Sequence, residues 1–343
     1  IPAPSEAEIR RALEVGAERE VRLGWTQVQV AGSSREELHA MRQLVAERRT
    51  LLRLYVAARA QTMDEELFVR GAVIDELDGR FTVRSVKCMV DGALGSNGAA
   101  LLEPYSDAPD NRGLIVQGED ILLPLFIRAL REGIQIEAHA IGDRGNRLAL
   151  DWFERAFAAV PRDQRKVPDP RWRIEHAQVI HPADIPRFRQ LGLIASMQPS
   201  HAISDLYFAP RKLGPNRLAG AYAWRTLLDA GVIIAGGSDA PVERGEPMIE
   251  FYAAVARRAL DGFAGPDWHL DQRVTREEAL RMFTVAPAYA AFQEKERGNI
   301  EVGKLADFTV LSADIMTIPE QEILRTECVM TVIGGEIAWE KKG

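Results

Sequence analysis

Four polar residues that can bind metal ions or move protons stand at or just beyond the ends of separate extended segments. They are Lys87, His139, His176 and Asp239. Imidazoles and carboxylates hold divalent metals in hydrolases, and the chemistry also needs a base that takes a proton from water. One such residue alone is weak evidence, since a histidine often has a purely structural role. The recurrence of His139, His176 and Asp239 at equivalent places predicts a metal site.

The segment QIEAHAIGDRGN (135–146) shows how such a residue is presented. Gln135, Glu137 and His139 fall on one side of an extended chain, and apolar residues fall on the other. A polar side that ends in His139 suits a barrel strand whose inner face opens onto a site. The Gly-Asp-Arg-Gly turn then leads the backbone away from the imidazole. The alternative is a hydrogen-bonded histidine at a strand end.

Lys87 poses a separate problem, because an ammonium group is repelled by a metal ion and cannot bind it. A desolvated lysine can react with carbon dioxide to give a carbamate, an anion whose two oxygens can bridge two cations. The alternative is an ion pair between Lys87 and Asp91 across the following turn. The spacing alone leaves both possibilities open.

These side chains need a framework of strands that end side by side. Extended patterns alternate with helical segments along the chain, and seven strands are predicted at 26–32, 51–59, 81–92, 133–142, 171–178, 193–199 and 231–241. Such alternation argues for a parallel sheet, either doubly wound or closed as a (β/α)₈ barrel. No Gly-x-Gly-x-x-Gly turn follows a strand, which argues against a dinucleotide-binding sheet.

The placement of the polar residues favours the barrel, because barrel enzymes gather catalytic groups at the carboxyl ends of several strands. The fold class predicted is therefore α/β, a TIM-type (β/α)₈ barrel. Seven parallel strands would leave two unpaired edges, so we expect the first strand to precede Ile1, outside this chain.

The alternation of extended and helical segments ends after the barrel segments. A helix is expected over 275–292, with a capping box at its start and a break near Pro287. Short strands with glycine turns follow. We therefore predict a barrel domain over 1–296 and a small C-terminal β-sandwich-type domain over 297–343.

Composition and charge limit the class of protein. A net charge of −7 and a pI near 5.6 give no basic surface for nucleic acid, so a small-molecule substrate is expected. Two cysteines far apart indicate no disulfide framework. Neither a membrane span nor a signal peptide is recognisable, and a cytoplasmic location is expected. A homo-oligomer is left open.

Six motifs together carry a resemblance to a known family. They are VKCMVDGALGSNGAALLEPYSD, EAHAIGDRGN, RIEHAQ, SMQPSH, GGSDAPVE and GNIEVGKLADFTVL. In this order, and over almost the whole chain, the sequence resembles the amidohydrolase superfamily, in its amidohydrolase-3 or YtcJ-like branch. The resemblance implies a barrel that hydrolyses amide-like, non-peptide C–N bonds of small molecules at one or two divalent metals, usually zinc.

The resemblance also implies roles for the four residues. Lys87 would be a carboxylated lysine that bridges the metals, and His139 and His176 would bind one of them. Asp239 would be a ligand and the general base that takes the proton of a metal-activated hydroxide.

One family element is absent. A His-x-His pair at the end of the first strand should hold the other metal, but His39 stands alone in a predicted helix. Either the pair lies outside this chain, or the site is weakened. The alternative function is therefore a catalytically impaired barrel that serves as a binding or structural subunit.

Three further residues are candidates for substrate binding. His201 could touch the substrate or stabilise an oxyanion, or it could be bonded locally. Asp143 and Arg144 could grip a polar substrate, although an ion pair between their side chains is favoured. Cys88 should point away from Lys87 along the strand, which argues against a nucleophilic role.

Overall fold

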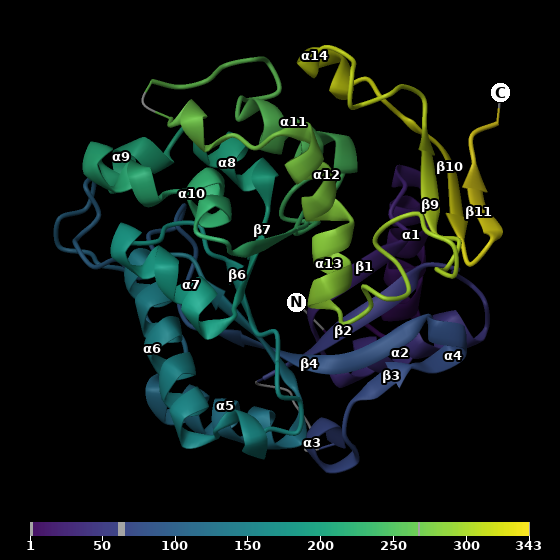
Figure 1. The fold of residues 1–343 in the computed structure, drawn as a ribbon, viewed down its shortest axis with the longest axis horizontal. Helices are drawn as coiled ribbons and strands as arrows, with labels where there is room; N and C mark the ends of the chain where they lie inside the picture. Colours follow the sequence, from purple (N-terminus) through teal and green to yellow (C-terminus); the bar gives the residue numbers. More distant parts are fainter. Residues whose placement is uncertain (1–2, 61–65, 267, 343) are drawn as a thin grey trace.

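An open, curled sheet of parallel strands forms the centre of the molecule in the computed structural model, which describes residues 3–60, 66–266 and 268–342 (Figure 1). The parallel strands are β1 (Gln27–Ser33), β2 (Arg53–Arg59), β4 (Phe81–Met89), β5 (Gln135–Ala140), β6 (Arg173–His176), β7 (Ile194–Met197) and β8 (Ile233–Gly236). They lie in the sheet in this order, and the short β3 (Val73–Asp75) pairs antiparallel with β4. All seven predicted parallel strands are therefore present.

The sheet does not close into a barrel. In the described part of the chain, β1 and β8 form its two edges and do not pair with each other. Closure requires a fixed number of strands tilted around a common axis, and seven strands of this curvature cover only part of the circle. Within the described residues the seven strands thus form an open, curled parallel sheet, which is consistent with the predicted TIM-type barrel but does not itself close.

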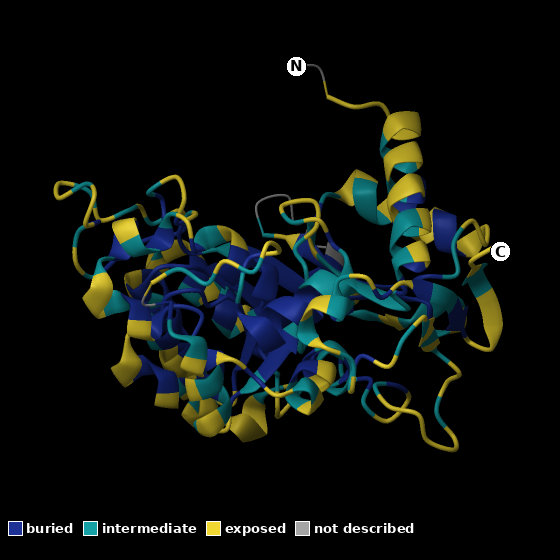
Figure 2. Ribbon diagram, turned by 90° about the horizontal axis from the view of Figure 1, so that it is seen from above, coloured by how far each residue is buried: buried dark blue, intermediate teal, exposed yellow. Residues whose placement is uncertain are grey.

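Helices separate the strands. The longer ones are α1 (Glu6–Leu23), α2 (Arg35–Ala46), α5 (Glu119–Glu132), α6 (Asp143–Ala159), α11 (Pro247–Ala256) and α12 (Arg276–Phe283). The shorter ones are α3 (Glu66–Arg70), α4 (Glu76–Gly79), α7 (Ile185–Leu191), α8 (Pro199–Asp205), α9 (Ala209–Leu213), α10 (Trp224–Asp229), α13 (Val285–Ala290) and α14 (Glu320–Ile323). Figure 2 shows buried strands at the centre and exposed residues on the outer faces of the helices. No described helix has the length and apolar character that a membrane span needs.

Local sequence chemistry places the helix ends. Ser5 and Thr275 each accept a hydrogen bond from the backbone three residues on, which completes the capping boxes of α1 and α12. The break predicted near Pro287 occurs at Thr284, between α12 and α13. A proline clashes with the carbonyl four residues before it, so a continuous helix cannot pass Phe283.

The C-terminal residues form a separate antiparallel sheet of β9 (Phe308–Leu311), β10 (Cys328–Ile333) and β11 (Glu336–Glu340), in the order β11-β10-β9. The sheet packs beside α1 (Figure 1). The hydroxyl of Thr331 donates to the carbonyl of Val21 over 2.7 Å, and that of Thr309 donates to Gly24 over 2.6 Å. A helix thus covers this sheet, and the described residues contain no second layer of a sandwich. The division at residues 296 and 297 stays a prediction.

A buried ion pair ties this sheet to the parallel one. Arg53, at the start of β2, donates to both carboxylate oxygens of Asp307 over 2.6 and 3.0 Å, and the two side chains are 3% and 4% exposed. We expect Asp307→Ala to lower the free energy of unfolding by about 3–5 kcal/mol, because Arg53 would be left buried and uncompensated.

Urea denaturation of the purified variant measures this loss. Glu327→Ala is the matched control, since Glu327 forms an ion pair with Lys341 in which both side chains are largely exposed. Its expected cost is below about 1 kcal/mol. Equal losses in the two variants would contradict a special role for the Arg53–Asp307 pair.

Candidate metal centre

The predicted ligands lie toward the carboxyl ends of four parallel strands, β4, β5, β6 and β8. Lys87 lies on β4, where it pairs in register with Glu137 of β5. His139 is two residues further along β5, and His176 is the last residue of β6. Asp239 follows β8 by three residues. Parallel strands carry these residues to one rim of the sheet, where α/β proteins commonly build their sites.

The two predicted metal-binding imidazoles are in contact. The ring centroids of His139 and His176 are 4.6 Å apart, and the rings meet edge to face at 69°. His201, from α8, stacks beside His176 at 5.9 Å, and its Nε2 lies 3.7 Å from Oδ2 of Asp239. The three rings are buried, and Asp239 is partly exposed. The structure therefore brings His139, His176, His201 and Asp239 into one cluster.

Burial keeps the imidazoles of this cluster neutral. Burial first, and then the positive charge of Lys87, lowers the pKa of His139 to about 3. The pKa of His176 falls well below its usual value, through burial first and then through His139 and Lys87. A neutral imidazole has a lone pair to offer a metal ion. Burial also raises the pKa of Asp239 to about 6, although Lys87 acts in the opposite direction.

The free ring nitrogens show whether these residues fit a metal. Nε2 of His139 is buried without a hydrogen-bond partner. His176 uses Nδ1 to contact Oε1 of Gln198 over 2.9 Å, which leaves its Nε2 for another ligand. Yet no group of three His, Cys, Asp or Glu side chains within residues 3–60, 66–266 and 268–342 is close enough to hold an ion. The two imidazoles fit a metal ion, which would need further ligands. Lys87 and Asp239 are the candidates for these ligands.

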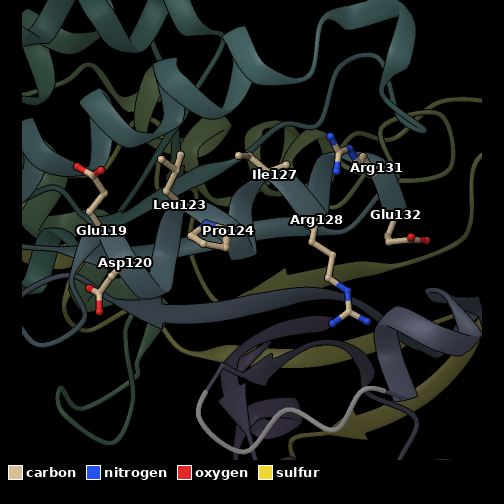
Figure 3. Close-up of a pocket in the computed structure, with 8 residues that line it drawn as sticks. All are labelled: Glu119, Asp120, Leu123, Pro124, Ile127, Arg128, Arg131 and Glu132. Atoms are coloured by element: carbon tan, nitrogen blue, oxygen red, sulfur yellow. The ribbon is translucent and has the colours of Figure 1, made fainter.

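A large cavity of about 1440 Å³ opens beside the cluster. Lys87, His176 and Asp239 line it, together with Arg173 and Glu175 deeper in the sheet. Figure 3 shows a different hollow, on the outer face of α5, whose lining includes Leu123, Pro124, Ile127 and Arg128. None of the predicted site residues lines this outer hollow, so the cavity at the rim is the candidate for substrate.

Asp91 has a role that the sequence did not reveal. Its carboxylate accepts hydrogen bonds from the backbone amides of Ala100, Ile141 and Gly142 over 2.8–2.9 Å, and Oδ1 lies 3.6 Å from Nε2 of His139. No ion pair links it to Lys87 in the described residues, so that alternative for Lys87 is wrong. Asp91 instead fixes the turn that follows His139.

The two glycines of the Gly-Asp-Arg-Gly turn lie close to Ala100 and Asp91, which leaves no room for a side chain at either position. A Cβ atom on Gly142 would lie 2.0 Å from the carbonyl oxygen of Ala100, and one on Gly145 would lie 2.4 Å from Oδ2 of Asp91. Any side chain at either position would therefore push α6 away from the loop that Asp91 anchors.

The predicted ion pair between Asp143 and Arg144 is not found. Oδ1 of the buried Asp143 accepts from the backbone amides of Leu102 and Arg144 over 2.8 and 3.0 Å, while the Arg144 side chain is exposed. Backbone amides thus satisfy this carboxylate. Cys88 is fully buried, and burial raises the pKa of its thiol to about 12, which agrees with a structural role.

Backbone strain marks the same rim. His176, Ala177 and Asp239 have φ angles of 74°, 45° and 55°, in the left-handed region that non-glycine residues rarely adopt. Such conformations cost on the order of 1–3 kcal/mol each and tend to cluster at functional sites. The strain turns His176 and Asp239 out of regular strand geometry, and sequence periodicity gives no sign of it.

Comparison with known proteins gives the family. The sequence model of the amidohydrolase family matches residues 2–338, nearly the whole chain. The chain belongs to the amidohydrolase family.

Related proteins agree with this assignment. This amidohydrolase is 34% identical over 273 residues to a Bacillus subtilis (strain 168) protein assigned as the amidohydrolase YtcJ, a match that covers 79% of the chain and 50% of the relative. It is 31% identical over 221 residues to the N-substituted formamide deformylase of Arthrobacter pascens, covering 64% of the chain and 39% of that enzyme.

A solved structure extends the comparison. An uncharacterised metal-dependent hydrolase of Pyrococcus furiosus superposes with a TM-score of 0.74 at 27% identity, over 88% of this chain and 59% of the other. The predicted superfamily and its YtcJ-like branch are thus confirmed. The chain spans 50% of the length of the YtcJ relative and 39% of that of the deformylase.

Proposed function

We propose that this amidohydrolase hydrolyses an amide-like, non-peptide C–N bond of a small molecule at a centre of one or two divalent metal ions. Zinc is the metal that we propose. One observation carries the proposal. The ring centroids of two buried imidazoles, His139 and His176, lie 4.6 Å apart, and His176 lines a cavity together with Lys87 and Asp239. The relative named as an N-substituted formamide deformylase supports a C–N bond as the point of cleavage.

Each residue has a distinct part in this proposal. His139 and His176 would hold the metal through ring nitrogens. Lys87 would be N-carboxylated: its neutral amine would add to carbon dioxide and release a proton, and the carbamate oxygens would supply further ligands. A bound divalent cation supplies Lewis acidity, which makes water nucleophilic at neutral pH and polarises a carbonyl. Without carboxylation, the Lys87 ammonium would oppose a cation.

Asp239 moves the proton. Its carboxylate lines the cavity, and burial raises its pKa to about 6. It takes the proton of the attacking water and returns it to the departing nitrogen, first as general base and then as general acid.

A second candidate function is a barrel-like subunit that binds partners or ligands without catalysis. The observation that favours it is the lack, in the described residues, of three acidic, histidine or cysteine side chains close enough to hold an ion. The sequence also has no His-x-His pair.

Release of amine from a panel of N-substituted formamides and simple amides separates the two functions. The purified protein is assayed after zinc loading, after treatment with a chelator, and after zinc is returned. We expect amine release that the chelator abolishes and zinc restores. A well-folded protein that binds no metal and releases no amine at any stage would favour the binding subunit.

A further inference from the structure

Two glutamines contact two neighbouring histidines in opposite ways. Oε1 of Gln198 lies 2.9 Å from Nδ1 of His176, and its amide nitrogen donates to the carbonyl of Ser196 over 3.4 Å. An amide oxygen can only accept a hydrogen bond, so Nδ1 of His176 must carry the proton. The Nε2 atom of His176 is then left with its lone pair.

The second pair is reversed. Nε2 of Gln178 lies 2.8 Å from Nδ1 of His201. In this orientation of the amide, Gln178 donates to Nδ1 of His201, which places the ring proton on Nε2. His201 therefore offers a donor where His176 offers a lone pair.

This difference decides what each ring can do. The two imidazoles stack at 5.9 Å with an angle of 27° between their planes, so position alone does not distinguish them as ligands. Nε2 of His201 is buried and has no hydrogen-bond partner, and it lies 3.7 Å from Oδ2 of Asp239. A proton on that nitrogen points a donor toward the carboxylate and blocks metal binding there.

We propose that Gln178 fixes His201 in the Nε2–H form, so that His201 is a positioning residue that orients the carboxylate of Asp239 and is not a metal ligand. The function of this Gln178–His201–Asp239 chain rests on the role proposed for Asp239 as the base. The protonation pattern itself requires neither metal nor substrate. Metal-binding histidines are commonly oriented by a hydrogen bond to the ring nitrogen that does not bind the metal. In His201 a hydrogen bond of the same kind places the proton on Nε2, so that this nitrogen does not bind a metal.

Nuclear magnetic resonance tests the pattern on the whole, metal-free protein. Histidine labelled with ¹⁵N in the ring gives correlations that distinguish the two neutral forms, and the chain has only six histidines to assign. His201→Asn and His176→Asn identify the signals of the two rings. We expect Nε2–H for His201 and Nδ1–H for His176 at pH 7.

Two glutamate variants sharpen the test. A carboxylate only accepts, so Gln178→Glu should move the proton of His201 to Nδ1, whereas Gln198→Glu should leave His176 unchanged. Gln178→Leu should leave His201 without a single preferred form. The inference is overturned if His201 carries its proton on Nδ1 in the unaltered protein, or if Gln178→Glu does not move it. Since these outcomes need no activity, absence of hydrolysis would count against the proposed function alone.

Discussion

Replacing Asp239 by asparagine is expected to lower the rate of amine release by about 10²–10⁴-fold, the range that a positioned acid–base group contributes. Asparagine has nearly the same shape, and its amide oxygen can still face the cavity. It cannot take the proton of water or return one to the departing nitrogen. The loss should therefore appear in kcat, with little change in the folded structure.

The matched control is Asp229→Asn. Asp229 is a largely exposed carboxylate that forms an i,i+4 ion pair with Arg225 on α10, and its replacement should leave the rate within about twofold. Circular dichroism of both variants verifies folding. If Asp239→Asn retains the rate of the unaltered zinc-loaded protein, Asp239 is not the base.

Replacing His176 by asparagine is expected to weaken zinc binding by at least about 100-fold, beyond the 10–100-fold typical of losing a residue that only supports a ligand. Asparagine can still contact Gln198, but it does not reach the cavity with a second nitrogen. His139→Asn should have a similar effect, because the Nε2 atom of His139 is the buried nitrogen that lacks a partner.

Calorimetric titration with zinc measures this loss, and His39→Asn provides the control. His39 is exposed on α2 and does not line the cavity at the rim, so its removal should leave the affinity unchanged. Equal affinity in the His176→Asn and His39→Asn variants would mean that zinc binds elsewhere.

Much of the framework could be predicted from sequence, because its signals are local. Alternating side chains marked β5, and the Ser5 and Thr275 capping boxes marked two helix starts. The break before Pro287 followed from the missing amide and the bulk of the ring. The order of strands then placed the polar residues at one rim.

The remaining features depend on contacts between distant segments. Asp91 anchors amides nine and about fifty residues away, and no spacing in the sequence indicates those partners. The contacts of Gln178 and Gln198 with the histidines likewise arise from adjacent strands. The left-handed backbone at His176 is a tertiary effect, since local preference opposes it. The open edges of β1 and β8, in contrast, were expected from the count of seven parallel strands.

The central claim is that Lys87, His139, His176 and Asp239 belong to one centre of divalent metal. X-ray absorption at the zinc edge of the zinc-loaded protein tests it most directly. We predict a shell of nitrogen and oxygen ligands at about 2.0–2.2 Å with the outer scattering of two imidazoles. That imidazole signal should disappear in the protein carrying both His139→Asn and His176→Asn. A spectrum without imidazole scattering, or one that the double variant leaves unchanged, would contradict the claim.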